Sequence, residues 1–360
     1  MFLELFFVFI YSFLSLFIMR KVANKIDLVD KPGARKHHDG AIPLVGGISI
    51  CLSISQFIVF KPNVIPHSNL FLTSIILLTI IGALDDKFEL SVKVRLVIQA
   101  VLSIVMLGIA DIELLHIGNL MGNGDINLGI LGPFATIFAV IGAINAFNMV
   151  DGIDGLLGGL SIITFAGISI LLRVDGQNGL SYLCLVFIVA MVPYVFMNLG
   201  ILGRKRKVFM GDAGSMMIGF TVIWLLLGAS QEASEPLIRP ITALWLIAVP
   251  LMDMAAIMLR RIRRGVSPFK PDREHLHHIF QRLGFSSRQT LFSICTFASC
   301  YAAFGIYGEL YAVAESTMFI LFMVCFGVYT TLLSYVWQIT SFLRRIRKKS
   351  EKMVYDNHNI

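Results

Sequence analysis

Charged residues are scarce in this sequence of 360 residues. Asp, Glu, Lys and Arg make up 15% of it, whereas hydrophobic residues make up 56%. A soluble domain carries about 25% charged residues, so this composition excludes an ordinary soluble protein and predicts an integral membrane protein.

Cysteine is scarce as well, and its placement argues against a metal site built on thiolates. The five cysteines all lie within apolar runs, and none has the spacing of metal ligands. They are Cys51, Cys184, Cys295, Cys300 and Cys325. We interpret them as packing residues.

Long apolar runs are what the sequence has in abundance. Runs of about 17 to 25 apolar residues are long enough to cross a bilayer as helices. The predicted spans cover residues 2–19, 43–60, 68–84, 96–112, 131–149, 156–172, 179–198, 214–229, 241–259, 291–308 and 316–340. The first run has no basic segment or small-residue cleavage site, so we expect it to be retained. We predict an all-α polytopic bundle of about eleven transmembrane helices.

The basic residues orient this predicted bundle. All but three of the 30 Lys and Arg residues fall on one side, which the positive-inside rule identifies as cytoplasmic. The other side holds only Lys61, Arg173 and Arg239. With an odd number of spans, the N-terminus is then periplasmic and the C-terminus cytoplasmic. Topology thus accounts for the net charge of +7 without a nucleic-acid partner.

The predicted domain organisation is simple. A single transmembrane catalytic domain covers residues 1–340, and a basic cytoplasmic tail covers residues 341–360. The lipid bilayer is the first partner that this organisation implies.

Five aspartates gather on the predicted cytoplasmic side. Asp85 and Asp86 end the third span, Asp151 and Asp154 follow the fifth, and Asp212 precedes the eighth. Carboxylates so close to lipid are costly, and neighbouring carboxylates repel one another unless a cation lies between them. The simplest shared purpose is to bind a divalent cation together with the phosphates that it holds.

Amides and basic residues accompany these acids. Asn145 and Asn148 lie on one face of the fifth span if it stays helical. Lys93 and Arg95 follow the Asp85–Asp86 pair and are placed to face phosphates, although isolated residues of this kind are more often markers of the positive side.

Three histidines lie within four residues of the longest cytoplasmic loop. They are His275, His277 and His278. The surrounding basic residues favour an anion site over zinc. Asp253 lies inside the ninth span, where it is either a functional acid or the partner of a neighbouring helix. Pro250 is placed to bend that span.

Five motifs, taken together and in order, resemble one known family. They are DKPGARKHH…PLVGG, GALDDKFELSVKVR, NAFNMVDGIDGLLGG, KVFMGDAGS and SPFKPDREHLHH, between residues 30 and 278. The chain resembles the polyprenyl-phosphate N-acetylhexosamine-1-phosphate transferase superfamily. The pattern His-Leu-His-His, in place of consecutive histidines, favours its undecaprenyl-phosphate N-acetylglucosamine-1-phosphate transferase branch over the muramoyl-pentapeptide branch.

This resemblance implies a reaction and a location. Undecaprenyl phosphate attacks the sugar-bearing phosphorus of UDP-N-acetylglucosamine, UMP leaves, and a lipid-linked diphosphate sugar forms. The product starts a cell-surface polysaccharide such as the O antigen of lipopolysaccharide. The enzyme is then a multi-pass protein of the bacterial inner membrane with its active site on the cytoplasmic face, and it uses Mg²⁺ or Mn²⁺.

The resemblance also implies roles for single residues. Asp212 matches the metal-binding aspartate, and Asn148 matches an asparagine that belongs to the metal site or contacts the diphosphate. The three histidines match a loop that contacts the donor. Asp85 and Asp86 match an aspartate pair proposed as base or metal-associated. We expect Asp151 and Asp154 to order the cavity or contact the nucleotide sugar. The remaining substrate-binding candidates are Asn145, Lys93, Arg95, Arg35 and Arg273.

Two other readings stay open at this point. The first is the same reaction with another UDP-N-acetylhexosamine or with a UDP-muramoyl-pentapeptide donor. The second, less favoured, is a cation-coupled transporter, which predicts charges at mid-membrane and symmetric halves. The sequence instead has its acids at one interface and no convincing repeat. It leaves a homodimer open.

Overall fold

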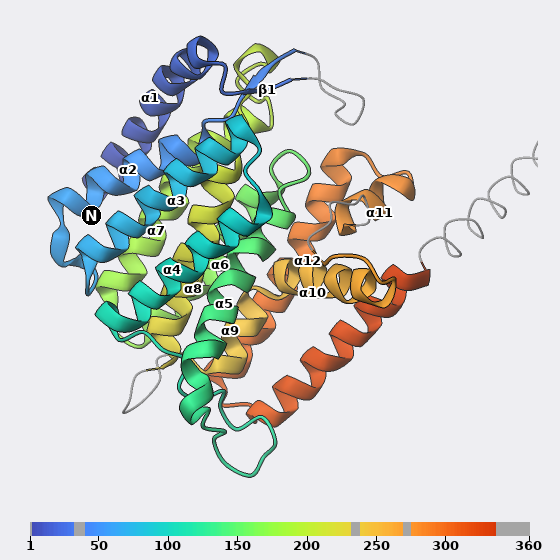
Figure 1. Cartoon of the computed structure of the whole chain (residues 1–360). Coiled ribbons are helices and arrows are strands. Elements are labelled where there is room, and N and C mark those ends of the chain that lie inside the picture. The colour runs from blue at the N-terminus through green and yellow to red at the C-terminus, as the bar shows by residue number, and fades with distance from the viewer. Residues whose placement is uncertain (1, 32–39, 232–237, 269–274, 336–360) are drawn as a thin grey trace, which may run out of the picture.

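The fold is known from a computed structural model that describes residues 2–31, 40–231, 238–268 and 275–335. This part of the chain is almost entirely helical (Figure 1). Its helices are α1 (Phe2–Ile26), α2 (Gly46–Phe60), α3 (Ser68–Phe88), α4 (Val92–Ala110), α5 (Gly132–Met149), α6 (Leu156–Val174), α7 (Asn178–Asn198), α8 (Asp212–Ser230), α9 (Pro240–Leu246), α10 (Ala248–Arg263), α11 (Leu276–Arg282), α12 (Ser287–Leu310) and a last helix, Glu315–Tyr335.

Many of these helices are long and apolar enough to cross a membrane. Nine meet this test in the described part of the chain, and the pair α9 and α10 makes a tenth if it is counted as one span. The helix α2 is apolar but has only 15 residues. The prediction of an all-α polytopic membrane protein is therefore confirmed, although not the count of eleven spans. The predicted tail, residues 341–360, lies outside the described residues.

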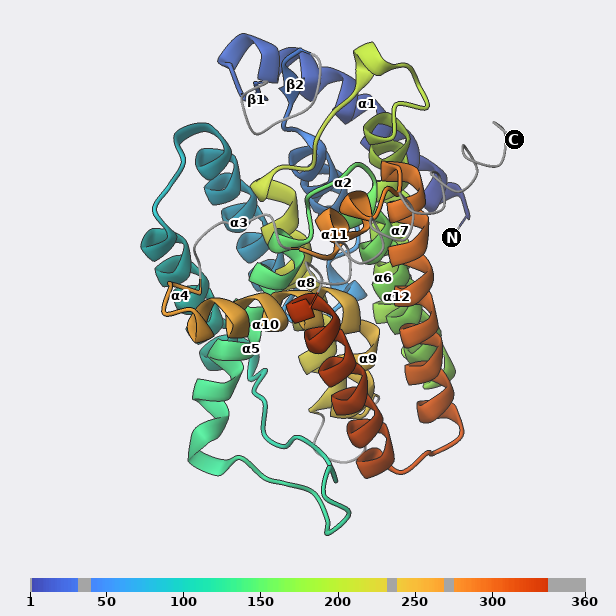
Figure 2. The ribbon, with the colours of Figure 1, turned by 90° about the vertical axis from the view of Figure 1, so that its right-hand side faces the viewer.

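The ninth predicted span is broken. The helices α9 and α10 meet at an angle of 85°, with Ile247 between them. Pro250 lies three residues after the break. It has no N–H to donate to the carbonyl of Leu246, and its ring crowds that carbonyl, so the helix cannot continue straight through Ile247. Figures 1 and 2 show α10 running across the bundle, while most other helices run along it.

The helix α8 occupies the centre of the bundle. Of its most apolar 18 residues, 94% are buried, against 17% in the helix Glu315–Tyr335. It packs against α5, α3, α2 and α6. Glycines allow two of these approaches: a Cβ atom on Gly47 of α2 would lie 2.1 Å from the Gly214 nitrogen, and one on Gly82 of α3 would lie 2.3 Å from the Ala213 nitrogen. The start of α8 is thus held between two helix backbones.

Backbone hydrogen bonds fix the segment that leads into α8. The short antiparallel pair β1 (Val29–Asp30) and β2 (Ile42–Pro43) precedes α2. The amides of Gly46 and Gly47 then donate to the carbonyls of Phe209 and Met210, at 2.9 and 3.0 Å. The loop before α8 is therefore bonded to the start of α2.

Candidate active site

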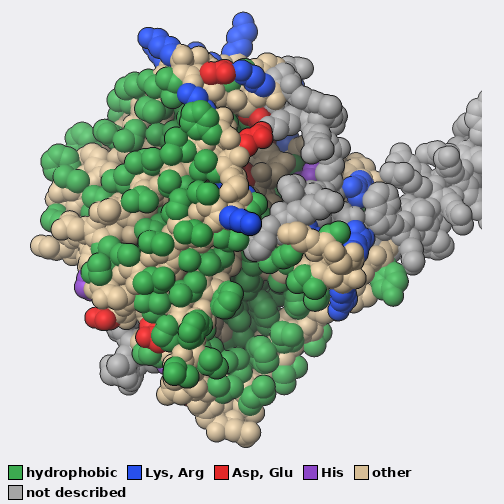
Figure 3. Space-filling model, viewed as in Figure 1, with side chains coloured by type: hydrophobic (Ala, Val, Ile, Leu, Met, Phe, Trp, Pro, Cys, Tyr) green, Lys and Arg blue, Asp and Glu red, His purple; other side chains and the backbone are tan. Residues whose placement is uncertain are grey.

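A cavity of about 1170 Å³ lies at one end of the bundle. It is lined by the ends of α3, α5 and α7, the start of α8, and residues of α11 and α12. Figure 3 shows acidic side chains at the edge of this hollow. Its walls include seven of the residues singled out in the sequence. These are Asp85, Asp86, Asn148, Asp151, Asp154, Asp212 and His278.

Asp86 binds the start of α8. Its carboxylate accepts hydrogen bonds from the backbone N–H groups of Asp212 and Ala213, at 2.8 and 3.3 Å. These amides lie in the first turn of the helix and have no partner within it, so a carboxylate there both caps α8 and complements its dipole. Gly211, with φ of 74°, turns the chain into this position, and a Cβ atom on it would lie 2.3 Å from Asp86 Oδ2.

Asp212 lies between an amide and a guanidinium. The Asn148 Nδ2 donates to Asp212 Oδ1 at 2.7 Å and to Ser215 Oγ at 2.9 Å. Arg95 lies 3.5 Å from Asp212 Oδ2 and 2.6 Å from the buried Asp85. Arg95 therefore compensates part of the negative charge that α3 and α8 bring together.

Asp154 and Asp151 differ in their partners. Lys207 donates to Asp154 at 2.6 Å. No cationic partner of Asp151 is found among the described residues. Protein around the cavity limits the hydration of Asp151, and the charges of Asp212 and Asp154 repel it, so its pKa rises from 3.8 to about 7.

The three histidines have three different surroundings. His275 lies with Nδ1 2.8 Å from the buried Asp253 of α10. His277 packs against Gly152, where an added Cβ atom would lie 2.1 Å from its Nε2. Burial, followed by the nearby imidazoles of His278 and His275, lowers the pKa of His277 to about 3, so this ring is neutral at physiological pH. Only His278 lines the cavity.

Five sequence candidates that the structure describes do not line the cavity: Arg95, His275 and His277, whose contacts are given above, and Asn145 and Lys93. Asn145 donates to Gln99 of α4 at 2.9 Å, so it joins α4 to α5. Lys93 is exposed and does not line the cavity. Arg35 and Arg273 lie outside the described residues.

Some residues at the site were not singled out from the sequence. Lys207 pairs with Asp154, and Ser215 accepts from Asn148. Asn198 accepts a hydrogen bond from the Gly155 amide and donates one to the Val208 carbonyl. These bonds join the end of α7 to the loop between α5 and α6 and to the loop before α8. Lys207 and Ser215 flank Asp212 in the motif KVFMGDAGS, which is the signal that points to them.

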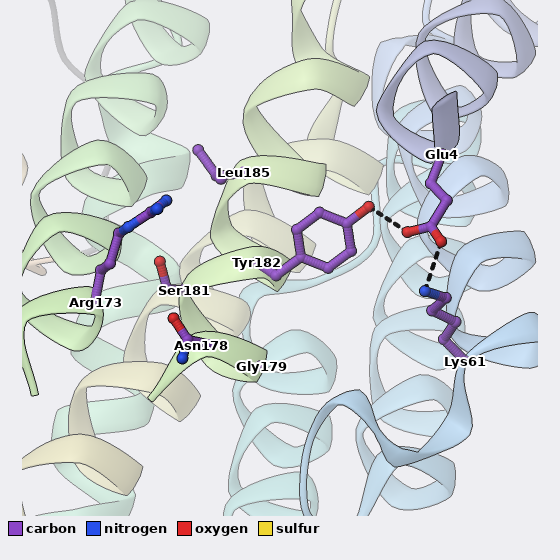
Figure 4. Close-up of a pocket in the computed structure, with 8 residues that line it drawn as sticks. All are labelled: Glu4, Lys61, Arg173, Asn178, Gly179, Ser181, Tyr182 and Leu185. Carbon is purple, nitrogen blue, oxygen red and sulfur yellow. Dashed lines mark hydrogen bonds and ion pairs between the residues drawn. The ribbon is translucent and has the colours of Figure 1, made fainter. Parts of the chain in front are cut away.

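A second, smaller cavity of about 430 Å³ lies at the opposite end of the bundle (Figure 4). Glu4 accepts from Lys61 at 2.7 Å and from the hydroxyl of Tyr182 at 2.6 Å. These contacts join α1, α2 and α7. Its lining has one acid and no group of carboxylates, so we assign the chemistry to the larger cavity.

The residues of the larger cavity fit a cation shared with a substrate. In the described part of the chain, no group of three or more His, Cys, Asp or Glu side chains is arranged to hold a metal ion. Mg²⁺ commonly takes one or two carboxylates and completes its shell with waters and substrate phosphates. Asp212 offers a carboxylate and Asn148 an amide oxygen. Asp151 also lines this cavity and has no cationic partner among the described residues, which favours a cation at this place.

Comparisons with known proteins place the chain among its relatives. The chain is 49% identical over 343 residues to the undecaprenyl-phosphate alpha-N-acetylglucosaminyl 1-phosphate transferase of Escherichia coli O157:H7, covering 95% of this chain and 93% of the relative. Proteins of the same name from Salmonella typhi and Haemophilus influenzae are 48% and 46% identical, over 99% and 98% of this chain and 97% and 99% of theirs. Residues 68–230 match the family described as Glycosyl transferase family 4.

This chain belongs to the family of undecaprenyl-phosphate alpha-N-acetylglucosaminyl 1-phosphate transferases. It is therefore an enzyme, and the resemblance found in its motifs is confirmed. The segment that matches the family runs from α3 to α8. It includes the five aspartates and Asn148 of the transferase but ends before the three histidines.

Proposed function

We propose that this transferase moves N-acetylglucosamine 1-phosphate from UDP-N-acetylglucosamine to undecaprenyl phosphate. UMP is released, and the lipid-linked diphosphate sugar starts a cell-surface polysaccharide. The observation that carries the proposal is the convergence of five aspartates in one cavity, in a chain 46–49% identical over nearly its whole length to transferases of this name. A polyprenyl acceptor stays in lipid and a nucleotide sugar stays in water, so a cavity at the end of the spans suits both.

We also propose the topology. The short helix α2 and the bent pair α9–α10 both cross the membrane, which makes eleven spans with the N-terminus periplasmic and the C-terminus cytoplasmic. The basic loops beside the cavity support a cytoplasmic active site in the bacterial inner membrane. The depletion of basic residues at the opposite end supports the same orientation.

The reaction is a substitution at phosphorus. An oxygen of the acceptor phosphate attacks the sugar-bearing phosphorus, and the bond from this phosphorus to the oxygen retained by UMP breaks. The sugar C1–O bond stays intact, so the anomeric configuration is kept. Such a step depends mainly on positioning and on neutralising charge. Bound Mg²⁺ or Mn²⁺, held by Asp212 and Asn148, would supply part of that neutralisation.

The side chains of the site divide the remaining work. Asp86 holds the first turn of α8, and Arg95 holds Asp85, so both acids of the pair are already engaged. Among the described residues Asp151 has no such partner, and its pKa is raised to about 7, so we assign to it any proton that the acceptor phosphate still carries. A phosphate monoester has a second pKa of about 6, so at neutral pH few acceptors carry one.

The direct test is transfer of label from UDP-N-acetylglucosamine to extracted undecaprenyl phosphate, with and without EDTA. We expect label in the lipid fraction, loss of transfer with EDTA, and recovery with Mg²⁺ or Mn²⁺. Asp212→Asn should insert normally but lose metal-dependent UMP release. Asp111→Asn, at an exposed position beyond the end of α4, is the matched control. Wild-type turnover by Asp212→Asn would count against the role given to Asp212.

A donor panel separates the related readings. Purified transferase is offered UDP-N-acetylglucosamine, UDP-N-acetylgalactosamine and UDP-muramoyl-pentapeptide in parallel. We expect the first to be the preferred donor. Turnover of only one of the others would replace the proposed donor while leaving the reaction class in place.

A further inference from the structure

Asp253 is an acid within the membrane part of the protein that the proposed reaction does not use. It lies in α10, six residues after the break at Ile247, and is 1% exposed. Burial of a carboxylate without partners is costly, so its hydrogen bonds show what it is for.

Three groups from two other parts of the chain bind Asp253. The hydroxyl of Tyr329, in the helix Glu315–Tyr335, donates at 2.6 Å, and the amide of Leu276 donates at 3.1 Å. The Nδ1 of His275 lies 2.8 Å from the other carboxylate oxygen. Asp253 therefore connects α10, the last helix and the start of α11.

The bonds to His275 and Leu276 fix where the histidine segment begins. His275 is the residue just before α11, and its ring is buried. Its ring stacks on His277 at 5.7 Å between centroids, and His277 contacts His278 at 4.2 Å. Since only His278 faces the cavity, its position depends on the anchor at His275.

We propose that Asp253 and Tyr329 are positioning residues, which hold the segment from His275 to His278 against the cavity and thereby govern binding of the nucleotide-sugar diphosphate. Asp253 accepts a hydrogen bond from the Nδ1–H of His275, and the other ring nitrogen, Nε2, therefore faces away from α10. Tyr329 holds the carboxylate in place from the other side. This inference rests on the proposed function, because it takes the segment from His275 to His278 to bind the UDP-sugar donor.

Kinetics of two variants test this role. Asp253→Asn weakens the charge-assisted bond to His275, and Tyr329→Phe removes only the hydroxyl. Charge-assisted hydrogen bonds contribute about 1.5–3 kcal/mol, so KM for the UDP-sugar should rise about 10- to 100-fold in Asp253→Asn, and less in Tyr329→Phe. KM for the lipid acceptor should stay within about twofold. Asp111→Asn and Tyr335→Phe, both at exposed positions, are the matched controls.

Chemical modification of histidines tests the anchor even if the variants are inactive. Diethyl pyrocarbonate modifies accessible imidazoles, and mass spectrometry reports each site. His275 should be protected in the wild type and modified in Asp253→Ala, whereas the exposed His67 should react equally in both proteins. Protection of His275 in the Ala variant would overturn the anchor.

The outcomes separate this inference from the proposed function. If the wild type transfers label but both variants keep the wild-type donor KM, the positioning role is wrong and the function stands. If the variants lose kcat without any change in donor KM, the role in donor binding is also wrong. If the wild type uses none of the UDP-sugars, the proposed function fails, while the labelling of His275 still tests the anchor.

Discussion

The close approach of α3 to α8 gives the most demanding test of the site. A Cβ atom on Gly82 would lie 2.3 Å from the nitrogen and 2.4 Å from the Cα of Ala213. Both are backbone atoms, so no side-chain rotation relieves the clash. Ordinary contact begins at 3.4 Å, so Gly82→Ala must separate the two helices by about 1 Å at this point.

That displacement falls on the part of α8 that carries the site. Asp86 lies one turn after Gly82 on α3 and binds the amides of Asp212 and Ala213. A 1 Å misplacement of a reacting group costs about 10²-fold in rate, and overpacking costs about 1–3 kcal/mol in stability. We expect kcat of Gly82→Ala to fall about 100-fold, with a measurably lower thermal midpoint.

Gly108→Ala is the matched control for this substitution. Gly108 also lies in an apolar helix, α4, but an added Cβ atom there meets nothing within 4 Å. Alanine is favoured over glycine in helices by up to about 1 kcal/mol, so this variant should keep full activity and equal or higher stability. Label transfer and thermal unfolding of the purified proteins measure both effects. Wild-type kcat in Gly82→Ala, or an equal loss in both variants, would refute the reasoning.

Three further predictions concern the loop after α5. Because the pKa of Asp151 is raised to about 7, its carboxyl is protonated below that pH. We therefore expect kcat/KM of the wild type to rise with pH to a plateau above about 7. A pH series should show that Asp151→Asn loses this rise. The same raised pKa means that the folded protein holds this proton more tightly than the unfolded chain does. Without metal, the free energy of unfolding should therefore fall as pH rises from about 4 to above 7. Denaturation at pH 5 and pH 8 checks this, and equal stability at both would contradict it. Gly152→Ala should push His277 away and raise the donor KM several-fold while leaving the acceptor KM unchanged, and steady-state kinetics with each substrate varied would expose an effect on the acceptor instead.

The spans and the aspartates were readable from the sequence for a physical reason. A span must be apolar over its whole length, and a carboxylate beside it stands out against that background. The ninth span shows the limit of this approach: Pro250 indicated a bend, but an angle of 85° depends on what α10 packs against. The apolar pattern also gave α2 as a full span, although its helix has only 15 residues.

Roles that depend on contacts between distant segments could not be read in this way. Asn145 and Asn148 share a face of α5, but Asn145 lies one turn further from the cavity and meets Gln99. The bond from Asp86 to the backbone at the start of α8 likewise follows only from how α3 packs against that helix. Asp253 and His275 are 22 residues apart, so their pairing follows only from the fold.

The enclosure of α8 separates the catalytic end of the protein from its lipid surroundings. Bilayers differ in thickness, and spans that touch lipid adapt by tilting. Such adjustments fall on outer helices such as α1 and the helix Glu315–Tyr335. Of the most apolar 18 residues of these two helices, 22% and 17% are buried. Asp212 stands on the one span among those described that protein surrounds almost completely. The outer helices can therefore vary with the composition of the host membrane while the geometry around Asp212 stays constant.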